Sequence, residues 1–313
     1  MADLHRLYEI RCPVHGFITI NDWEREIIEQ PAFQRLRRIR QLAWTDQVYP
    51  GAMHTRFEHS LGVLHVATRL YESIAERSWS ILRSELAYDD QGLKRERALV
   101  RLAALLHDVG HAPFSHAAED LFPPVDPQDS GRDADGEVAP VQRFKHESYS
   151  AAIIRTHLRD VIENHPLNHN YEFKADQIAN LLEGNTRAGR AVLWREIISG
   201  QLDADRMDYL IRDSVHAGVD YGKFDWRRLV NSVELVRGGE NRGLRLGVGE
   251  GGLHAAEGLV IARYFMFTQV YFHKTRVAYD IHLRNALSEI LPGGTFPRPE
   301  GEDLDEYLRW DDW

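Results

Sequence analysis

The segment Leu99–His116, with the sequence LVRLAALLHDVGHAPFSH, constrains this chain more than any other. Its apolar run predicts a buried helix that ends at His107 and Asp108, and His111 and His116 follow within nine residues. An imidazole and a carboxylate buried side by side cost free energy unless they pair with each other or coordinate an ion. The segment therefore indicates either a core histidine beside a capping aspartate or part of a metal site.

Two other segments offer the further ligands that a metal site needs. His59 lies in the first turn of a predicted amphipathic helix, beside its apolar stripe. Downstream, LDADRMDYLIRD (202–213) holds four aspartates, which repel one another unless a cation or an arginine neutralises them. Mixed imidazole and carboxylate ligands suit Mn, Fe, Ni, Zn or Mg and do not choose among these metals. The candidate ligands are His59, His107, Asp108 and one aspartate of 202–213.

The order of these residues resembles the H…HD…D signature of HD-domain phosphohydrolases. Five segments in family order are similar to the deoxynucleoside triphosphate triphosphohydrolase branch, which includes the vertebrate SAM-and-HD-domain enzyme and bacterial dGTPase-like proteins. The resemblance extends from about Leu7 to Leu308 and implies a mainly α-helical HD fold with one divalent metal ion. The segments are PAFQRLRRIRQL (31–42), HTRFEHSLGV (54–63), HDVGHAPFSH (107–116), KHE (145–147) and LDADRMDYLIRD (202–213).

Within 202–213, the family pattern implies which aspartate binds the metal. The pattern is D-x-D followed by a basic residue and, three residues later, a tyrosine. Aligning Tyr209 and Asp213 with it makes Asp205 the ligand, together with His59, His107 and Asp108. Asp203 would then cap the helix, and Asp208 would pair outward.

Hydrolysis of a nucleoside triphosphate requires a Lewis acid at a phosphoryl oxygen and a proton for the leaving 5′-oxygen. The metal supplies the first, and histidine titrates in the range suited to the second. By resemblance the proton donor is one of His111, His116 and His146, with Glu147 orienting one of them. The alternative for His116 is a structural role, packing under Phe114 and capping a helix.

The resemblance also implies the residues that bind the substrate. A triphosphate carries about four negative charges, so its pocket must contain cations. For the basic residues of the predicted C-terminal helix, the alternative is a solvated face around a core tyrosine. Gln41 and Leu42 match a pair beside the deoxyribose, and Tyr271 matches a tyrosine that helps to exclude a 2′-hydroxyl. The implied set is Gln41, Leu42, Arg56, Arg206, Tyr209, Asp213, Arg263, Tyr271 and Lys274.

Glu29, Gln34 and Arg37 match positions that form a guanine-nucleotide activator site between subunits in regulated family members. Gln34 and Arg37 keep the family pattern, whereas Cys12 replaces an aspartate of that site and Ala43 replaces a common glycine elsewhere. Family members work as dimers or tetramers, so we expect a homo-oligomer. They also continue beyond this C-terminus, which favours a truncated chain or a short natural form.

The pattern of apolar residues predicts a mainly α-helical chain with short N-terminal strands at 8–11 and 17–20 and a β-hairpin at 233–236 and 244–248. We expect an HD metallohydrolase core over 1–230, and a hairpin and long helix over 231–313 that complete the nucleotide pocket. The Pro-, Asp- and Gly-rich stretch 123–140 predicts a flexible loop, either a lid or an inert insertion. Helices are predicted at 22–29, 32–42, 56–86, 94–108, 147–163, 174–182, 190–199, 203–213 and 254–290.

The amino-acid composition restricts the compartment and the binding partners that we expect for this chain. The one cysteine, Cys12, rules out an internal disulfide and fits a reducing compartment. No apolar stretch approaches the length of about 20 residues that a membrane span needs, and the N-terminus lacks a signal pattern. The net charge of −10 disfavours sequence-independent binding to nucleic acid. We therefore expect a cytoplasmic protein with a nucleotide substrate and no membrane partner.

The leading hypothesis is hydrolysis of a deoxynucleoside triphosphate to deoxynucleoside and triphosphate. An HD-type phosphomonoesterase acting on nucleoside monophosphates and a 3′ exonuclease are the enzymatic alternatives, and an open groove of stacking aromatics would favour the exonuclease. A non-catalytic nucleotide sensor is a second alternative, but such a sensor has no need to keep every metal ligand. The sequence leaves open the base, the metal, the activation by nucleotides and the number of subunits.

Overall fold

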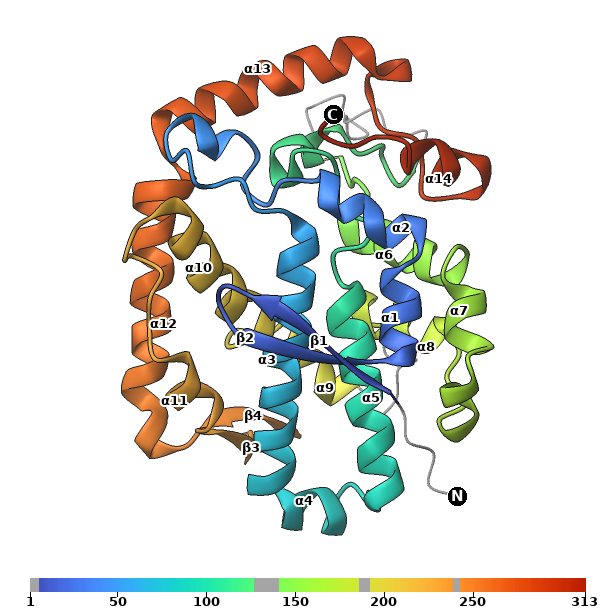
Figure 1. Ribbon diagram of the computed structural model, residues 1–313, viewed down its shortest axis with the longest axis vertical. Helices are drawn as coiled ribbons and strands as arrows, with labels where there is room; N and C mark the ends of the chain where they lie inside the picture. Colours follow the sequence, from blue (N-terminus) through green and yellow to red (C-terminus); the bar gives the residue numbers. More distant parts are fainter. Residues whose placement is uncertain (1–5, 127–140, 186–191, 239–242) are drawn as a thin grey trace, which may run out of the picture.

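The structure is a computed structural model that describes residues 6–126, 141–185, 192–238 and 243–313. The fold is mainly α-helical, as predicted, and within these ranges the strands form two antiparallel pairs. Helix α3 (Arg56–Arg77) runs through the middle of the molecule with α5 (Asp90–Leu106) on one side and α10 (Ala204–Ala217) on the other (Figure 1). No helix of the described part of the chain is long and apolar enough to cross a membrane.

The core forms where the apolar faces of α3 and α5 meet. Every residue from Leu99 to Leu106 is buried, as are Leu61, Leu64 and Leu70 of α3. A fully buried leucine contributes roughly 1.5–3 kcal/mol relative to an exposed one, so this contact holds α5 firmly on α3. The C-terminal end of α5 therefore delivers His107 and Asp108 to a fixed place beside the first turn of α3.

The N-terminal strands form a hairpin that crosses in front of α3 in Figure 1. Strand β1 (Leu7–Cys12) pairs with β2 (Gly16–Asn21), and Gly16 takes the positive φ that the tight turn needs. Helix α1 (Asp22–Ile28) follows directly, because Asn21 and Glu24 form a reciprocal capping box at its start. The hairpin turn places His15 against the interior of the molecule, where it is buried.

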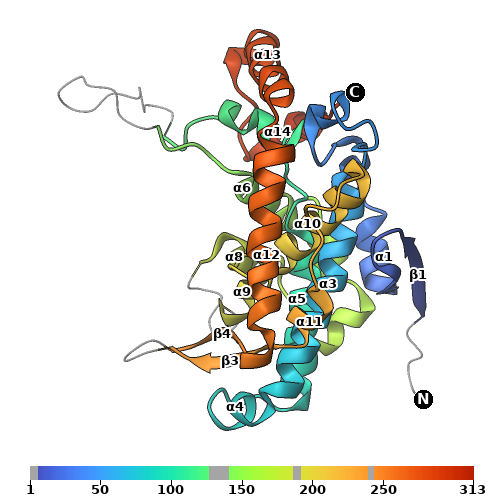
Figure 2. The same ribbon diagram turned by 90° about the vertical axis from the view of Figure 1, so that its left-hand side faces the viewer.

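The remaining helices enclose this centre. Helix α12 (Leu253–Met266) runs along one edge of the molecule, and α13 (Lys274–Ile290) lies across its top in Figure 1. Figure 2 shows α12 upright below α13, so the two helices point in different directions. A second hairpin, β3 (Val233–Arg237) with β4 (Leu244–Val248), confirms the predicted one. The other helices are α2 (Pro31–Gln34), α4 (Trp79–Ser84), α6 (His146–Arg155), α7 (Arg159–Glu163), α8 (Ala175–Glu183), α9 (Val192–Ile198), α11 (Trp226–Val230) and α14 (Gly301–Tyr307).

The single helix predicted at 32–42 is wrong. Helix α2 and a 3-10 turn at Arg35–Arg38 end before Ile39, which is extended. The backbone then pairs with residues 54–56, because the Arg56 N–H donates to the Ile39 carbonyl at 2.9 Å and Gln41 N–H to the His54 carbonyl at 3.0 Å. These long-range hydrogen bonds replace the helical ones and hold Gln41 beside the start of α3.

Three other predicted helices are broken. The helix at 56–86 is interrupted at Ser78, whose hydroxyl accepts a hydrogen bond from the Leu235 N–H of β3 at 2.8 Å. The helix at 147–163 is split into α6 and α7. The helix predicted at 254–290 is divided into α12 and α13. A π-helical turn at Phe267–Tyr271 follows α12, and α13 then begins with His273 as its N-terminal cap. Most of the predicted loop 123–140 lies outside the described residues.

Candidate active site

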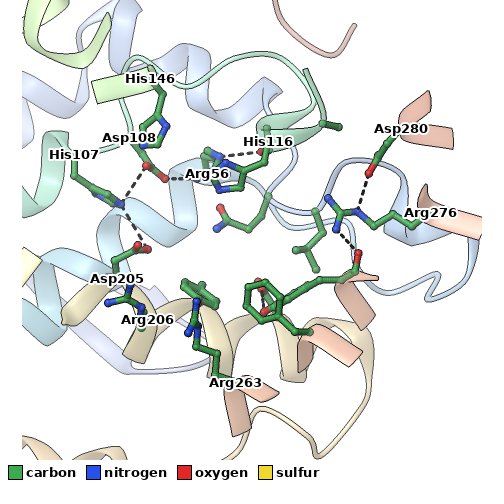
Figure 3. A pocket seen from close by; sticks show the side chains of 18 of the residues that line it. Arg56, His107, Asp108, His116, His146, Asp205, Arg206, Arg263, Arg276 and Asp280 are labelled. Carbon is green, nitrogen blue, oxygen red and sulfur yellow. Dashed lines mark hydrogen bonds and ion pairs between the residues drawn. The ribbon is translucent and has the colours of Figure 1, made fainter. Parts of the chain in front are cut away.

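A cavity of about 620 Å³ lies where α3, α10 and the bend between α12 and α13 meet. Its walls come from segments far apart in the sequence, as Figure 3 shows. Of the residues predicted for substrate, metal and catalysis, His59, His111 and Lys274 do not border it. Those that do are Gln41, Leu42, Arg56, His107, Asp108, His116, His146, Glu147, Asp205, Arg206, Tyr209, Asp213, Arg263 and Tyr271.

Three of the four predicted metal ligands border one end of this cavity, and the fourth, His59, is fully buried beside them. The His59 Nε2 atom lies 3.0 Å from Asp205 Oδ1 and 3.6 Å from Asp108 Oδ2. His107 Nε2 lies 3.3 Å from Asp108 Oδ1 and 3.9 Å from Asp205 Oδ1, and Figure 3 shows it between the two carboxylates. His107 Nε2 is buried and has no hydrogen-bond partner among the described residues. Ligand atoms of His59, His107 and Asp108 all lie within 4.8 Å of one another, which fits a divalent cation, and the Asp205 carboxylate faces the two histidines as a further ligand.

Each of the two histidines is oriented by a hydrogen bond on its other nitrogen. His59 Nδ1 lies 2.8 Å from Asp208 Oδ2, and His107 Nδ1 lies 2.9 Å from the Ala104 carbonyl oxygen. Nδ1 is then the protonated nitrogen, which leaves the Nε2 lone pair for a metal. The first turn of α3 and the end of α5 thus hold two imidazoles whose orientation is already fixed for binding a metal.

The prediction that Asp208 pairs outward is wrong. Its carboxylate is fully buried and binds His15 Nε2 at 2.6 Å, His59 Nδ1 at 2.8 Å and the Arg212 guanidinium at 2.7 and 2.9 Å. Burial alone raises the pKa of Asp208, but Arg212 and the hydrogen bonds from both histidines hold that pKa well below its ordinary range. Asp203, in contrast, caps α10 as predicted, since its carboxylate accepts from the Arg206 N–H at 2.7 Å.

Gly62 makes room for this buried network. It lies on α3, and a Cβ at this position would overlap the Asp208 carboxylate and the Arg212 guanidinium. The glycine in HTRFEHSLGV is therefore required by the packing of α10 against α3. The Arg212 guanidinium also reaches the Cys12 sulfur at 3.5 Å, which ties the N-terminal hairpin to the metal centre.

A second cluster of titratable side chains lies next to the metal centre. Glu119 joins its histidines: His116 Nδ1 lies 2.9 Å from Glu119 Oε2, and His146 Nδ1 lies 2.7 Å from Glu119 Oε1. Burial lowers the pKa of His146, but the bond to Glu119 outweighs it and raises that pKa to about 9. Glu147, predicted to orient a histidine, lies 3.6 Å from His146 Nδ1, so Glu119 makes the shorter contact.

The loop that carries these histidines has a constrained backbone. Phe114 and Ser115 have φ values of 56° and 55°, in the left-handed region that costs non-glycine residues roughly 1–2 kcal/mol each. The Asp312 carboxylate compensates, because it accepts hydrogen bonds from the Phe114 N–H at 2.7 Å and the Arg40 N–H at 2.8 Å. Ala43 also has a positive φ of 45°, which explains why a glycine suits that position.

The opposite end of the cavity is built around Asp213. Its carboxylate accepts from the Tyr271 hydroxyl at 2.6 Å and contacts His54 Nε2 at 2.8 Å. The buried Gln41 Oε1 has no hydrogen-bond partner in the described part of the chain, so it can accept one from a ligand. Lys274 is exposed at the start of α13, and Arg276 borders the cavity instead, two residues further on.

Comparison with known proteins identifies the family. The HD domain model matches residues 56–213, and the model described as HD associated region matches residues 224–312.

The chain belongs to the HD-domain family.

Among solved structures, this HD-domain protein resembles a hypothetical protein from Aquifex aeolicus, with a TM-score of 0.74 and 32% identity over 98% of this chain and 70% of the other. It is 34% identical to an uncharacterised protein of Methanocaldococcus jannaschii, over 90% of this chain and 49% of that protein. It is also 34% identical to the deoxynucleoside triphosphate triphosphohydrolase SAMHD1 of Gallus gallus, over 77% of this chain and 38% of that protein. The chain spans about half the length of the first curated relatives that it matches.

Several residues of the site were assigned no role from the sequence, although His54 opens the segment HTRFEHSLGV. His15, His54, Glu119 and Arg276 enter through contacts between segments that lie far apart in the chain, and none belongs to a spacing that predicts a ligand. Glu119 follows His116 by three residues, which is a spacing that allows a contact on a helical turn. The predicted activator residues Glu29, Gln34 and Arg37 lie away from the cavity walls, and their role stays a prediction.

Proposed function

We propose that this chain is a metal-dependent phosphohydrolase that converts a deoxynucleoside triphosphate to deoxynucleoside and triphosphate. The observation that carries the proposal is a single cavity with two different ends. One end holds the two-histidine, two-aspartate set, and the other holds Gln41, Tyr271 and Asp213. The likeness to SAMHD1, named a deoxynucleoside triphosphate triphosphohydrolase, supports the same substrate class.

The cations around the cavity support a substrate with several phosphates. Arginines border it from α3, α10, α12 and α13, and a guanidinium can bind phosphate oxygens through two N–H groups. All but Arg263 also form an ion pair with an aspartate. Arg206 is held by an ion pair with Asp203 at 2.8 Å, which fixes its position at the metal end. The arginines on the cavity wall are Arg56, Arg206, Arg263, Arg276 and Arg284.

A divalent ion bound by His59, His107, Asp108 and Asp205 would polarise the phosphoryl oxygen nearest to it. Gln41, Tyr271 and Asp213 would hold the sugar at the other end, so that the α-phosphate, which is next to the sugar, lies at the ion. The Tyr271 ring occupies space beside Asp213 and would exclude a 2′-hydroxyl.

His116 is the proton donor that the geometry favours. It borders the cavity, and Glu119 binds its Nδ1, so its Nε2 is the nitrogen left to protonate the leaving 5′-oxygen. His111 is fully buried behind the cavity wall, and the His146 side chain is only 19% exposed, against 61% for His116. A proton delivered to the 5′-oxygen releases intact triphosphate.

The test is an incubation of the purified protein with each dNTP, NTP and dNMP in Mn²⁺ or Mg²⁺, followed by chromatography of the products. We expect deoxynucleoside and triphosphate in equal amounts from dNTPs, and no turnover by Asp205→Asn. His254→Gln, at an exposed histidine, is the matched control and should keep full activity. Orthophosphate as the first product, or equal turnover of dNMP and dNTP, would instead support the phosphomonoesterase.

A further inference from the structure

The segment 310–313 follows α14 and packs against backbone that leads into the site. The Asp312 N–H donates to the Arg38 carbonyl at 3.0 Å. The Trp310 carbonyl accepts from Arg35 Nε at 2.9 Å. Figure 2 shows the C-terminus beside the segment that follows α2, and these hydrogen bonds fix where the Asp312 side chain lies relative to that segment.

Asp312 joins two backbone segments through the two oxygens of one carboxylate. Its Oδ1 accepts from the Phe114 N–H at 2.7 Å, and its Oδ2 accepts from the Arg40 N–H at 2.8 Å. Phe114 lies two residues before His116, and Arg40 is directly followed by Gln41. One side chain therefore connects the loop that carries the proposed proton donor to the segment that carries a residue of the sugar end.

Ser115 connects the same two segments and joins them to α3. Its hydroxyl donates to the Arg40 carbonyl at 2.6 Å and accepts from Arg56 Nε at 2.9 Å. The Arg56 guanidinium also pairs with Asp108, one of the predicted metal ligands. The backbone that Asp312 holds is thus part of a hydrogen-bonded network that reaches the metal end of the cavity.

The loop needs such a contact because its backbone is unfavourable for the residues it contains. Phe114 and Ser115 both lie in the left-handed region, and such residues keep this conformation only where surrounding contacts impose it. A hydrogen bond from an N–H to an ionised carboxylate is roughly twice as strong as one to a neutral acceptor. Burial raises the pKa of Asp312 to about 6, against the two backbone hydrogen bonds and the charges of Arg40 and Arg35, so the carboxyl is ionised in assays at about pH 8.

We propose that Asp312 is a positioning residue that holds His116 in register with the sugar end of the cavity. Asp312 does not border the cavity itself, so it acts through the Phe114 and Arg40 backbone. The consequence for the reaction rests on the proposed function, whereas the connection between the two segments does not.

The two segments differ in how much they depend on Asp312. The segment around Arg40 has other supports, because the Gln41 N–H donates to the His54 carbonyl at 3.0 Å. The loop at Phe114 has an unfavourable backbone to maintain. Loss of the carboxylate should therefore displace His116 more than Gln41, and it should affect the chemical step more than substrate binding.

The first experiment measures hydrogen exchange by mass spectrometry and uses no substrate. In Asp312→Ala, peptides that contain the Phe114 or Arg40 amide should exchange about 10–100-fold faster than in the wild type, and peptides of α3 should keep their protection. Asp312→Asn keeps one accepting oxygen, so its exchange should lie between the two. This variant also tests the proposal if Asp312→Ala does not fold.

The second experiment measures steady-state kinetics at about pH 8 on the nucleotide that the wild type hydrolyses fastest. Asp312→Ala should lower kcat by about 10–100-fold and change KM much less, with Asp312→Asn in between. Glu163→Gln is the matched control, since Glu163 Oε1 also accepts a backbone N–H across two segments, from Ala175 at 3.0 Å, but lies away from the cavity walls. This control should keep the wild-type kcat and the wild-type exchange at Phe114.

Unchanged exchange at Phe114 and Arg40 would overturn the proposal, and so would a wild-type kcat in Asp312→Ala. An equal fall of kcat in Glu163→Gln, or a loss of protection in every helix of Asp312→Ala, would mean a general structural role and would also overturn it. If the wild type hydrolyses none of the nucleotides, the proposed function fails. The exchange at Phe114 and Arg40 then decides by itself whether Asp312 connects the two segments.

Discussion

Asp208 lies behind the metal centre, and Asp208→Asn tests whether it positions a metal ligand. The amide keeps the shape of the side chain but removes the charge that Arg212, His15 and His59 share. Arg212 is fully buried, so it would be left without its counter-charge. Breaking a buried ion pair costs about 3–5 kcal/mol, and losing the partner of a metal-bound histidine lowers metal affinity by about 10–100-fold.

We therefore expect two separate effects from Asp208→Asn. The free energy of unfolding, measured by urea denaturation, should fall by about 3–5 kcal/mol. The dissociation constant for Mn²⁺ at the two-histidine, two-aspartate site should rise by about 10–100-fold, because the amide can present its N–H to His59 and disturb the orientation of the ring. Calorimetry on folded protein, well below the denaturation midpoint, measures the second effect independently of the first.

A buried ion pair elsewhere in the fold provides the matched control. Glu24 binds Arg101 through both oxygens, at 2.6 and 2.7 Å, and both side chains are buried. Glu24→Gln should lower stability by a similar amount and leave metal affinity unchanged. The reasoning would be refuted if Asp208→Asn bound Mn²⁺ as tightly as the wild type, or if Glu24→Gln weakened Mn²⁺ binding equally.

Four further outcomes follow from the same geometry. His116→Gln should lower kcat by about 10²–10⁴ with little change in KM, measured by steady-state kinetics on a dNTP. Arg206→Gln should weaken binding of the triphosphate more than that of the monophosphate, as measured by competition between dNTP and dNMP. Gly62→Ala should lower both stability and Mn²⁺ affinity, and combining it with Asp208→Asn should add less than the two separate losses, because both disturb one network. In metal-free protein, burial lowers the pKa of His59 but two aspartates raise it to about 10, so its stabilising contribution is fully present below about pH 6.5 and should disappear as the pH rises through about 10 in urea titrations.

The sequence predicted best where a pattern repeats within one segment. The apolar period of α3 and α5 gave their type and starting region, because burial on one face is a local property of a helix. The apolar period failed at 32–42, where a backbone group of a later segment replaces a helical hydrogen bond, and at 254–290, where a nearby side chain binds a carbonyl at the bend. The Ile39 carbonyl binds the Arg56 N–H, and the Arg276 guanidinium binds the Tyr271 carbonyl at the bend.

The candidate site shows the same difference between features that local patterns predict and features that depend on contacts between segments. The residues His59, His107, Asp108 and Asp205 could be named from motifs, since ligand chemistry depends on residue type and on the order of the segments. Asp208 was assigned to the outside because helical spacing gives a direction relative to one helix and says nothing of which helices surround it. Lys274 was assigned to the cavity because the helix was taken as unbroken, and the bend at 272–273 exposes it.

By itself, the sequence determined the helical class and the family, and it predicted the set of metal ligands, all of which depend on residue types at short spacings. The tertiary structure decided which groups orient those ligands. His15 from the first hairpin, Asp208 from α10 and His59 from α3 meet at one carboxylate, and Glu119 meets His146 across 27 residues of chain. Packing brings such groups together through surfaces that no single segment carries, and only the folded chain defines those surfaces.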